Sequence, residues 1–216
     1  MKAAVGALRA GHESPEATGR ILDAAESVFA ARGYHGASTR DIAEAAGIGK
    51  RMLFYYFASK DDLYRAVLDR IVGAMSDIHG RFSGQPAEQG LAAGVEAITR
   101  FAAANGDAVR VLVREIMDDG PYVRELVSER LGPLFAVARD EVASSMAEGR
   151  YATGDPTHVL LSVGGLTLFY FLNLPLLRHL GGDDPLDPAV VDERVRMTID
   201  LLMNGLAGRV GRGGPT

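Results

Sequence analysis

The chain has 216 residues, of which 47% are apolar and 24% are charged, and it contains no Cys. This apolar content excludes intrinsic disorder for most of the chain, and the lack of Cys excludes disulfide scaffolds, thiolate zinc sites, iron–sulfur clusters and Cys nucleophiles. The formal net charge of −5 is unevenly spread: residues 1–60 carry eight Lys and Arg against six Asp and Glu, and the remainder is acidic. Because salt screens charge beyond roughly 10 Å, the acidic remainder does not prevent a local basic face from meeting phosphates.

The amino-terminal residues lack the hydrophobic region of a secretory signal. The apolar stretch that follows Lys2 is short and is broken at Arg9. Together with the lack of Cys, this pattern is consistent with a reducing compartment, and we expect a cytoplasmic protein.

Hydrophobic periodicity predicts an all-α fold of about nine helices. Apolar residues recur at helical spacing, as at Ile21, Ala25, Val28 and Phe29, and no stretch sustains the alternation of a strand. Clusters of glycine and proline mark the helix ends. The predicted helices cover residues 18–32, 39–46, 50–56, 60–82, 86–104, 107–118, 121–148, 156–179 and 188–207.

The helix lengths predict two domains. The first three helices are short, and helices of seven or eight residues are not stable alone, so they must pack into one compact unit. We expect this three-helix domain at 18–64, a connecting helix at about 60–82 and a larger helical bundle at 83–208. Residues 1–17 and 209–216 are expected to be flexible tails.

The most informative segment is residues 38–57, STRDIAEAAGIGKRMLFYYF. Ser38 followed by Asp41 is typical of a capping box at a helix start. Gly47 falls where this helix should end in a left-handed residue, and Ala43 is small enough for a second helix to cross closely. Leu53 then points back toward the first helix. This spacing favours a helix-turn-helix.

The outer face of these two helices is basic and aromatic. Lys and Arg side chains suit phosphate contacts and can also read guanine edges, and Tyr hydroxyls add further phosphate contacts. On these features alone, a chance helical hairpin with a solvated basic face is an equally good interpretation. The side chains concerned are Arg40, Lys50, Arg51, Tyr55, Tyr56 and Lys60.

A wider run of motifs resembles the TetR (tetracycline-repressor-type) family of bacterial transcriptional regulators. The resemblance covers residues 18–68 and rests on GYHGASTRDIA at 33–43, AGIGK at 46–50, LFYYF at 53–57 and SKDDL at 59–63. It implies that the second short helix enters the major groove of DNA. It also implies a homodimer whose carboxy-terminal domain binds a small effector.

The resemblance assigns DNA contacts position by position. Thr39 and Arg40 match contacts at the start of the supporting helix, and Lys50 and Arg51 match the first turn of the recognition helix. Tyr55, Tyr56 and Lys60 match its aromatic region and a phosphate-contacting Lys. Gly49, Met52 and Phe54 depart from the family pattern by removing hydroxyls, and Arg51 adds a charge where small residues are common. The expected DNA-binding residues are Thr39, Arg40, Lys50, Arg51, Met52, Phe54, Tyr55, Tyr56 and Lys60.

The carboxy-terminal half contains a 19-residue stretch without charge, Val159–Leu177. By length it is compatible with a membrane span. Asn173, Pro175 and an amphipathic helix at 188–207 favour another interpretation, a helix buried in a core and a subunit interface at once. We therefore expect no membrane contact and a homodimer formed by these two helices, which would hold two recognition helices about 34 Å apart.

The effector site is the least constrained prediction. Long helices around a largely apolar space with a few polar groups make a plausible site. Each candidate has an alternative: the large apolar side chains as core, the His and Arg as surface residues, and Tyr170 and Asn173 as polar groups satisfied by another subunit. The candidates are His79, Phe101, Arg114, Met117, Phe169, Tyr170 and Asn173.

No motif predicts an enzyme, a metal site or a cofactor. The five His residues lack metal-ligand spacing, no Ser lies in a G-x-S-x-G motif, and Gly49-Lys50 lacks the rest of a phosphate loop. The carboxylates at 115, 118, 119, 140 and 141 are interpreted as a solvated helix face.

These observations predict a ligand-responsive regulator that binds double-stranded DNA. We expect a repressor that binds a palindromic operator as a homodimer and is released by a largely apolar small molecule. The alternative is a small-molecule-binding or protein-interaction module that has lost specific DNA binding.

Overall fold

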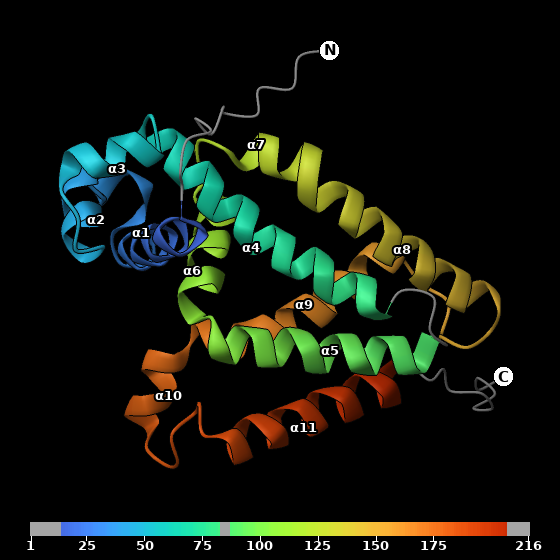
Figure 1. Cartoon of the computed structure of the whole chain (residues 1–216). Coiled ribbons are helices and arrows are strands. Elements are labelled where there is room, and N and C mark those ends of the chain that lie inside the picture. Colours follow the sequence, from blue (N-terminus) through green and yellow to red (C-terminus); the bar gives the residue numbers. More distant parts are fainter. Residues whose placement is uncertain (1–13, 83–86, 207–216) are drawn as a thin grey trace, which may run out of the picture. The chain divides into compact units, whose positions relative to one another are not determined.

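The computed structural model describes residues 14–82 and 87–206, and these residues form helices and turns without a strand, which confirms the predicted all-α fold. The chain divides into two compact units (Figure 1). Unit 1 comprises the described residues up to Gly73 together with Asp107–Leu126, and unit 2 comprises Ala74–Gly106 together with the described residues from Val127 onward. Residues 1–13 of the tail expected at 1–17, the tail expected at 209–216 and the helix break expected at 83–86 lie outside the described residues, whereas residues 15–17 of the expected tail are helical.

Unit 1 contains the three predicted amino-terminal helices. Its elements are α1 (Pro15–Gly36), α2 (Thr39–Ala45), α3 (Lys50–Tyr56), the first part of α4 (Lys60–Phe82), nearly all of α6 (Gly106–Met117) and α7 (Val123–Leu126). Helix α1 begins three residues before its predicted start, with Pro15 in its first turn. It is kinked at Gly33, whose φ of 69° is left-handed. Buried Phe29, Ile42, Leu53 and Leu63 form the centre of this unit's core.

Helices α6 and α7 belong to unit 1, although the sequence placed them in a contiguous domain at 83–208. The contacts of α6 explain the difference. The Arg114 guanidinium donates to the carbonyl of Ala30 in α1 at 3.3 Å, and Glu115 accepts a hydrogen bond from Tyr64 of α4 at 2.9 Å. Packing, rather than chain order, therefore sets the boundary between the units.

Unit 2 is a bundle of longer helices. It contains the end of α4, α5 (Ala87–Ala104), the π-helical turn η1 (Val127–Leu131), α8 (Gly132–Ala147), α9 (Pro156–Leu172), α10 (Leu174–Leu180) and α11 (Pro188–Leu206). Helix α5 packs against α8, α9 and α11. Val95, Val163 and Leu202 form one apolar cluster, one from each of α5, α9 and α11.

The helix predicted at 121–148 forms from Val123 to Ala147, but a π-helical turn, η1, changes its backbone hydrogen bonding at Val127–Leu131. In the π-helical turn one extra residue enters the helix, and the α-carbon of Gly132 comes so close to the Val127 carbonyl that a Cβ there would lie 2.5 Å from its oxygen. Pro133 follows and has no N–H to donate to the preceding turn. The π-helical turn therefore lies directly before a glycine–proline pair, and hydrophobic periodicity alone does not predict such a turn.

The helix predicted at 156–179 is broken between α9 and α10. The two segments bend by 60°. The break lies at Asn173, where Pro175 enters the first turn of α10 and cannot donate a backbone hydrogen bond to the preceding turn. Over the described residues, no single helix is long and apolar enough to cross a membrane, and only this bent pair passes such a test together.

Candidate functional site

Helix α2 begins with the predicted capping box. The backbone N–H of Asp41 donates to Ser38 Oγ at 3.1 Å, and the backbone N–H of Ser38 donates to Asp41 Oδ2 at 3.3 Å. Arg32 of α1 donates to the same carboxylate at 2.6 Å. The hydrogen bond from the Ser38 hydroxyl and the charge of Arg32 lower the pKa of Asp41 from its ordinary value. The start of α2 is therefore stabilised both by the Ser38–Asp41 capping box and by the Arg32 contact with α1.

The turn between α2 and α3 has the predicted conformation. Gly47 has a φ of +66°, which a side chain with a Cβ adopts only at a cost, and the N–H of Ile48 donates to the Ala43 carbonyl at 3.0 Å. Leu53 of α3 is buried together with Ile42 and Ala43 of α2. The small Ala43 and the left-handed glycine thus bring two short helices together in the geometry expected of a helix-turn-helix.

Most of α3 that does not face α2 is exposed. Lys50, Arg51, Met52, Phe54 and Tyr55 are exposed, whereas Tyr56 is half-buried and its ring lies 5.4 Å from that of Tyr55. The Lys50 ammonium lies 5.6 Å from the centre of the Phe54 ring. On α2, Arg40 is exposed and Thr39 is half-buried. We call the nine expected DNA-binding positions the α3 face: Thr39, Arg40, Lys50, Arg51, Met52, Phe54, Tyr55, Tyr56 and Lys60.

Lys60 donates hydrogen bonds to backbone carbonyls near the end of α1. Its ammonium donates to the carbonyls of Tyr34 at 2.8 Å and Ala37 at 3.2 Å, and it lies 4.3 Å from the centre of the Tyr34 ring. The ammonium has three donors in total, so one remains for a phosphate. The structure therefore gives Lys60 a first role in holding the start of α4 to the end of α1.

Glu115 corrects one sequence interpretation. The sequence pattern predicts that Glu115 lies on a solvated helix face, but its side chain is buried and only 2% exposed. Its carboxylate accepts from the Tyr64 hydroxyl at 2.9 Å and from the Tyr122 N–H at 2.6 Å, which together compensate the burial of its charge. Burial and this carboxylate raise the pKa of Tyr64 above its ordinary value. Tyr64 lies 51 residues away in the sequence, so no local pattern signals the pair.

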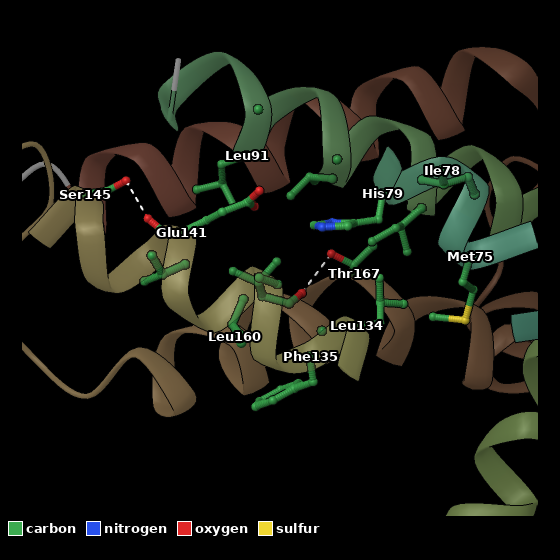
Figure 2. A pocket seen from close by; sticks show the side chains of 18 of the residues that line it. Met75, Ile78, His79, Leu91, Leu134, Phe135, Glu141, Ser145, Leu160 and Thr167 are labelled. Atoms are coloured by element: carbon green, nitrogen blue, oxygen red, sulfur yellow. Dashed lines mark hydrogen bonds between the residues drawn. The ribbon is translucent and has the colours of Figure 1, made fainter. Parts of the chain in front are cut away.

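Unit 2 encloses a cavity of about 540 Å³ between the end of α4, α5, α8 and α9 (Figure 2). Its lining is mostly aliphatic, with Leu91, Leu134 and Leu160 among the labelled side chains, and His79 projects into it from α4. A mostly apolar cavity of this size with a few polar groups is typical of a small-molecule site.

Of the seven predicted effector residues, only His79 lines this cavity. Phe101 is half-buried elsewhere in unit 2, and Arg114 belongs to unit 1. The alternative interpretation of Met117 and Phe169 as core residues is wrong, because they are 77% and 67% exposed. Helical spacing marks an apolar face, and it does not say whether the chain itself covers that face.

Tyr170 and Asn173 find their partners within the chain. The Tyr170 hydroxyl donates to the Pro185 carbonyl at 3.1 Å, and the Asn173 side-chain amide donates to the Phe169 carbonyl at 2.7 Å. These contacts remove the need for a ligand or another subunit to satisfy them.

A second exposed surface is apolar and lies on α9 and α11. We call it the apolar face, and Leu161, Leu166 and Phe169 of α9 and Met197 and Leu201 of α11 form it. Single exposed apolar residues are common, but a group of large ones on two packed helices is typical of a protein–protein interface.

Among residues 14–82 and 87–206, no three His, Asp or Glu side chains come together in a group fit for a metal ion. The site that the structure presents is thus a cationic and aromatic helix face in unit 1 and an apolar cavity in unit 2.

Two family matches account for most of the chain. Residues 21–67 match the family described as "Bacterial regulatory proteins, tetR family". Residues 87–202, just over half of the chain, match the "Tetracyclin repressor-like, C-terminal domain". The first match covers the helix-turn-helix, and the second covers α5, α8 and α9 of the cavity lining, while the end of α4 with His79 lies between the two matches.

Relatives and solved structures agree with these matches. The HTH-type transcriptional regulator RutR of Escherichia coli (strain K12) is 28% identical over 192 residues, covering 88% of this chain and 90% of RutR. The structure of the ketosteroid transcriptional regulator KstR2 of Mycobacterium tuberculosis superposes with a TM-score of 0.74 at 18% identity, over 93% of this chain and 100% of that one. AibR, in complex with isovaleryl coenzyme A and operator DNA, superposes with a TM-score of 0.71 at 16% identity, over 87% of this chain and 98% of that one.

The helix-turn-helix, the cavity-bearing helical bundle and the two family matches lead to one conclusion: this chain belongs to the TetR family and is a DNA-binding transcriptional regulator.

Proposed function

We propose that the protein is a repressor that binds a palindromic operator as a homodimer through the α3 face and leaves it when a largely apolar small molecule occupies the cavity of unit 2. The observation that carries the proposal is the exposure of Lys50 and Arg51 in the first turn of α3, while Leu53 anchors the same helix on α2. A helix held in this way can enter the major groove without disturbing its own support.

The nine residues of the α3 face divide by chemistry. Arg40, Lys50 and Arg51 supply positive charge for phosphates or guanine edges, and Thr39, Tyr55 and Tyr56 supply hydroxyls. Met52 and Phe54 supply apolar contact, for which the methyl group of thymine is a suitable partner. Lys60 contributes its remaining N–H to a phosphate.

The apolar face supports the homodimer. Two copies that join their α9 and α11 helices would cover Leu161, Phe169 and Leu201, which are all more than half exposed in one chain. A twofold interface also matches the symmetry of a palindrome, since each copy then reads one half-site and the half-sites lie about 34 Å apart.

The effector acts through a difference in affinity. Helix α4 begins at Lys60, beside the end of α1, and carries His79 of the cavity lining near its other end. An effector that binds more tightly to the conformation with α4 in one position shifts the population toward that conformation. The shift in free energy is no larger than the difference between the two binding free energies. AibR is a structural neighbour that was solved with both an acyl-coenzyme A and operator DNA.

Selection of bound sequences from a random DNA pool tests the proposal. We expect a palindromic consensus, and we expect a steep decrease of affinity with salt. If Arg40, Lys50, Arg51 and Lys60 of both copies neutralise phosphates, the logarithmic slope is about −7. Arg40→Ala should make this slope shallower by about 2 per dimer, whereas Arg139→Ala in unit 2 should not change it.

The proposal fails if no sequence is enriched and binding is absent even in dilute buffer. Enrichment of a non-repeated site by a monomer contradicts the dimer and leaves the α3 face in place. Repression is tested by transcription in vitro from a promoter that overlaps the selected site, where the protein should lower the yield of transcript.

A further inference from the structure

His79 is distinguished from the other polar side chains around the cavity by a buried ring nitrogen that has no hydrogen-bond partner within residues 14–82 and 87–206. Its Nε2 atom is buried, and over the described residues it has no hydrogen bond. A buried polar atom without a partner is rare in folded proteins, because its desolvation is not compensated. Figure 2 shows the imidazole pointing from α4 toward the middle of the lining.

The Thr and Ser hydroxyl groups of the lining are already engaged. Thr167 donates to the Val163 carbonyl at 2.8 Å, and Ser145 donates to the Glu141 carbonyl at 2.9 Å (Figure 2). Ser144 donates to the carboxylate of Glu148 at 3.0 Å. Their hydrogens are therefore directed at the protein itself and are not available to a guest molecule.

The fully charged side chains of the lining are also unsuited to holding a buried ionic group. Glu141 and Arg150 are exposed, and Arg150 forms an ion pair with Glu148 and a hydrogen bond with Ser145 at 3.3 Å. The remaining lining is mainly aliphatic and aromatic, including Phe135 and Tyr151. An ion placed there would lose its hydration without a free counter-charge.

From these observations we propose that the effector is an uncharged, mostly apolar molecule with one hydrogen-bonding oxygen, and that this oxygen pairs with Nε2 of His79. A neutral imidazole nitrogen either donates or accepts, so both a carbonyl and a hydroxyl oxygen satisfy it. The inference rests on the proposed effector role of the cavity and adds the chemical class of the ligand and the residue that selects it.

Competition between matched probes tests the pairing on the full-length protein. N-phenyl-1-naphthylamine, an uncharged fluorophore, reports occupancy of the cavity. We expect 4-butylphenol and n-butylbenzene, which differ by a single hydroxyl, each to displace it. His79→Leu should decrease the affinity for 4-butylphenol about tenfold, because a buried hydroxyl loses its hydrogen-bond partner. It should not decrease the affinity for n-butylbenzene.

Two further variants locate the effect. His79→Gln places an amide near the position of Nε2 and should recover most of the affinity for 4-butylphenol. Thr167→Val removes a hydroxyl of the same lining that is already bonded to Val163, and it should leave both probes unchanged. Retained binding of n-butylbenzene shows that each variant is folded.

The outcomes separate this inference from the proposed function. Equal losses for both probes in His79→Leu, or a loss in Thr167→Val instead, overturn the pairing. Stronger displacement by 4-butylbenzoate than by 4-butylphenol in the wild type overturns the uncharged class, and failure of every probe to bind overturns the cavity as a ligand site. The DNA selection is carried out without probes and is therefore independent of them. If the probes bind normally but no DNA sequence is selected, the operator proposal is refuted and the role of His79 stands.

Discussion

The α3 face and the apolar face are both exposed, and both carry large side chains, but their chemistry differs. The first sets Lys50 and Arg51 among aromatic residues, whereas α9 contains no Asp, Glu, Lys or Arg in its whole length. A charged face remains well hydrated until a polyanion replaces its counterions. An apolar face instead gains free energy whenever a second apolar face removes it from water.

This difference suggests an order of events. The apolar face is expected to be covered at all times by a second copy, and the α3 face only when DNA is present. The two surfaces can therefore be disrupted separately, because a change on one removes the dimer and a change on the other removes only DNA binding.

The largest effect is expected from Phe169→Glu. A carboxylate on the apolar face would be buried without a partner in both copies, which should raise the dimer dissociation constant by at least about 100-fold. Sedimentation analysis measures the change, and Met117→Glu, at an equally exposed apolar residue of unit 1, is the control. If Phe169→Glu remains as dimeric as the wild type, the apolar face is not the interface.

Lys50→Ala should weaken operator binding without changing the dimer. Loss of one base or phosphate contact costs about 1–3 kcal/mol at each half-site. Fluorescence anisotropy at a defined salt concentration measures it, with Arg139→Ala as a control that removes an exposed Arg of unit 2. Unchanged affinity would show that Lys50 does not contact the operator.

Gly47→Ala tests the support of the α3 face. A Cβ at this position meets no atom within 4 Å, so the whole cost comes from the left-handed φ of +66°. We expect the free energy of unfolding to decrease by about 1–2 kcal/mol. Chemical denaturation followed by circular dichroism provides the measurement, and a neutral result would mean that the turn relaxes to another conformation.

The smallest effect is expected from Gly49→Ser. Gly49 is the N-cap of α3 in an extended conformation, has no side-chain cap and has free space around its Cβ position. A Ser hydroxyl should accept from the backbone of the first turn and stabilise the protein by a few tenths of a kcal/mol. A decrease in stability of the same size as in Gly47→Ala would show that the two glycines are constrained alike.

The sequence predicted unit 1 in more detail than unit 2. The capping box at Ser38, the left-handed Gly47 and the buried Leu53 are local features, and each depends on residues only a few positions apart. The π-helical turn before Gly132 and the bend before Pro175 are local too, but continuous apolar periodicity does not reveal them. Glu115 could not be predicted to be buried, since its partner Tyr64 is on a different helix.

The cavity was the part least accessible to sequence reasoning. Its lining comes from four helices, so a spacing pattern on any one of them does not distinguish a residue that lines a cavity from one that packs in a core or faces a partner. The sequence marks His79 as a polar candidate, but only the structure shows that its Nε2 atom is buried without a hydrogen bond among the described residues.

The amino-acid sequence by itself determined that the chain is helical and that a capped helix, a left-handed glycine and a second short helix present cations near its amino terminus. These features follow from backbone conformation and side-chain spacing within a few residues. Only the tertiary structure decided which apolar residues enclose a space, which ones face outward, and which polar atom in that space is left without a partner. Those properties depend on the space between packed helices and on the hydrogen-bond partners that each helix offers to the others. The helices concerned are distant in the sequence, so the chain order does not show which of them meet.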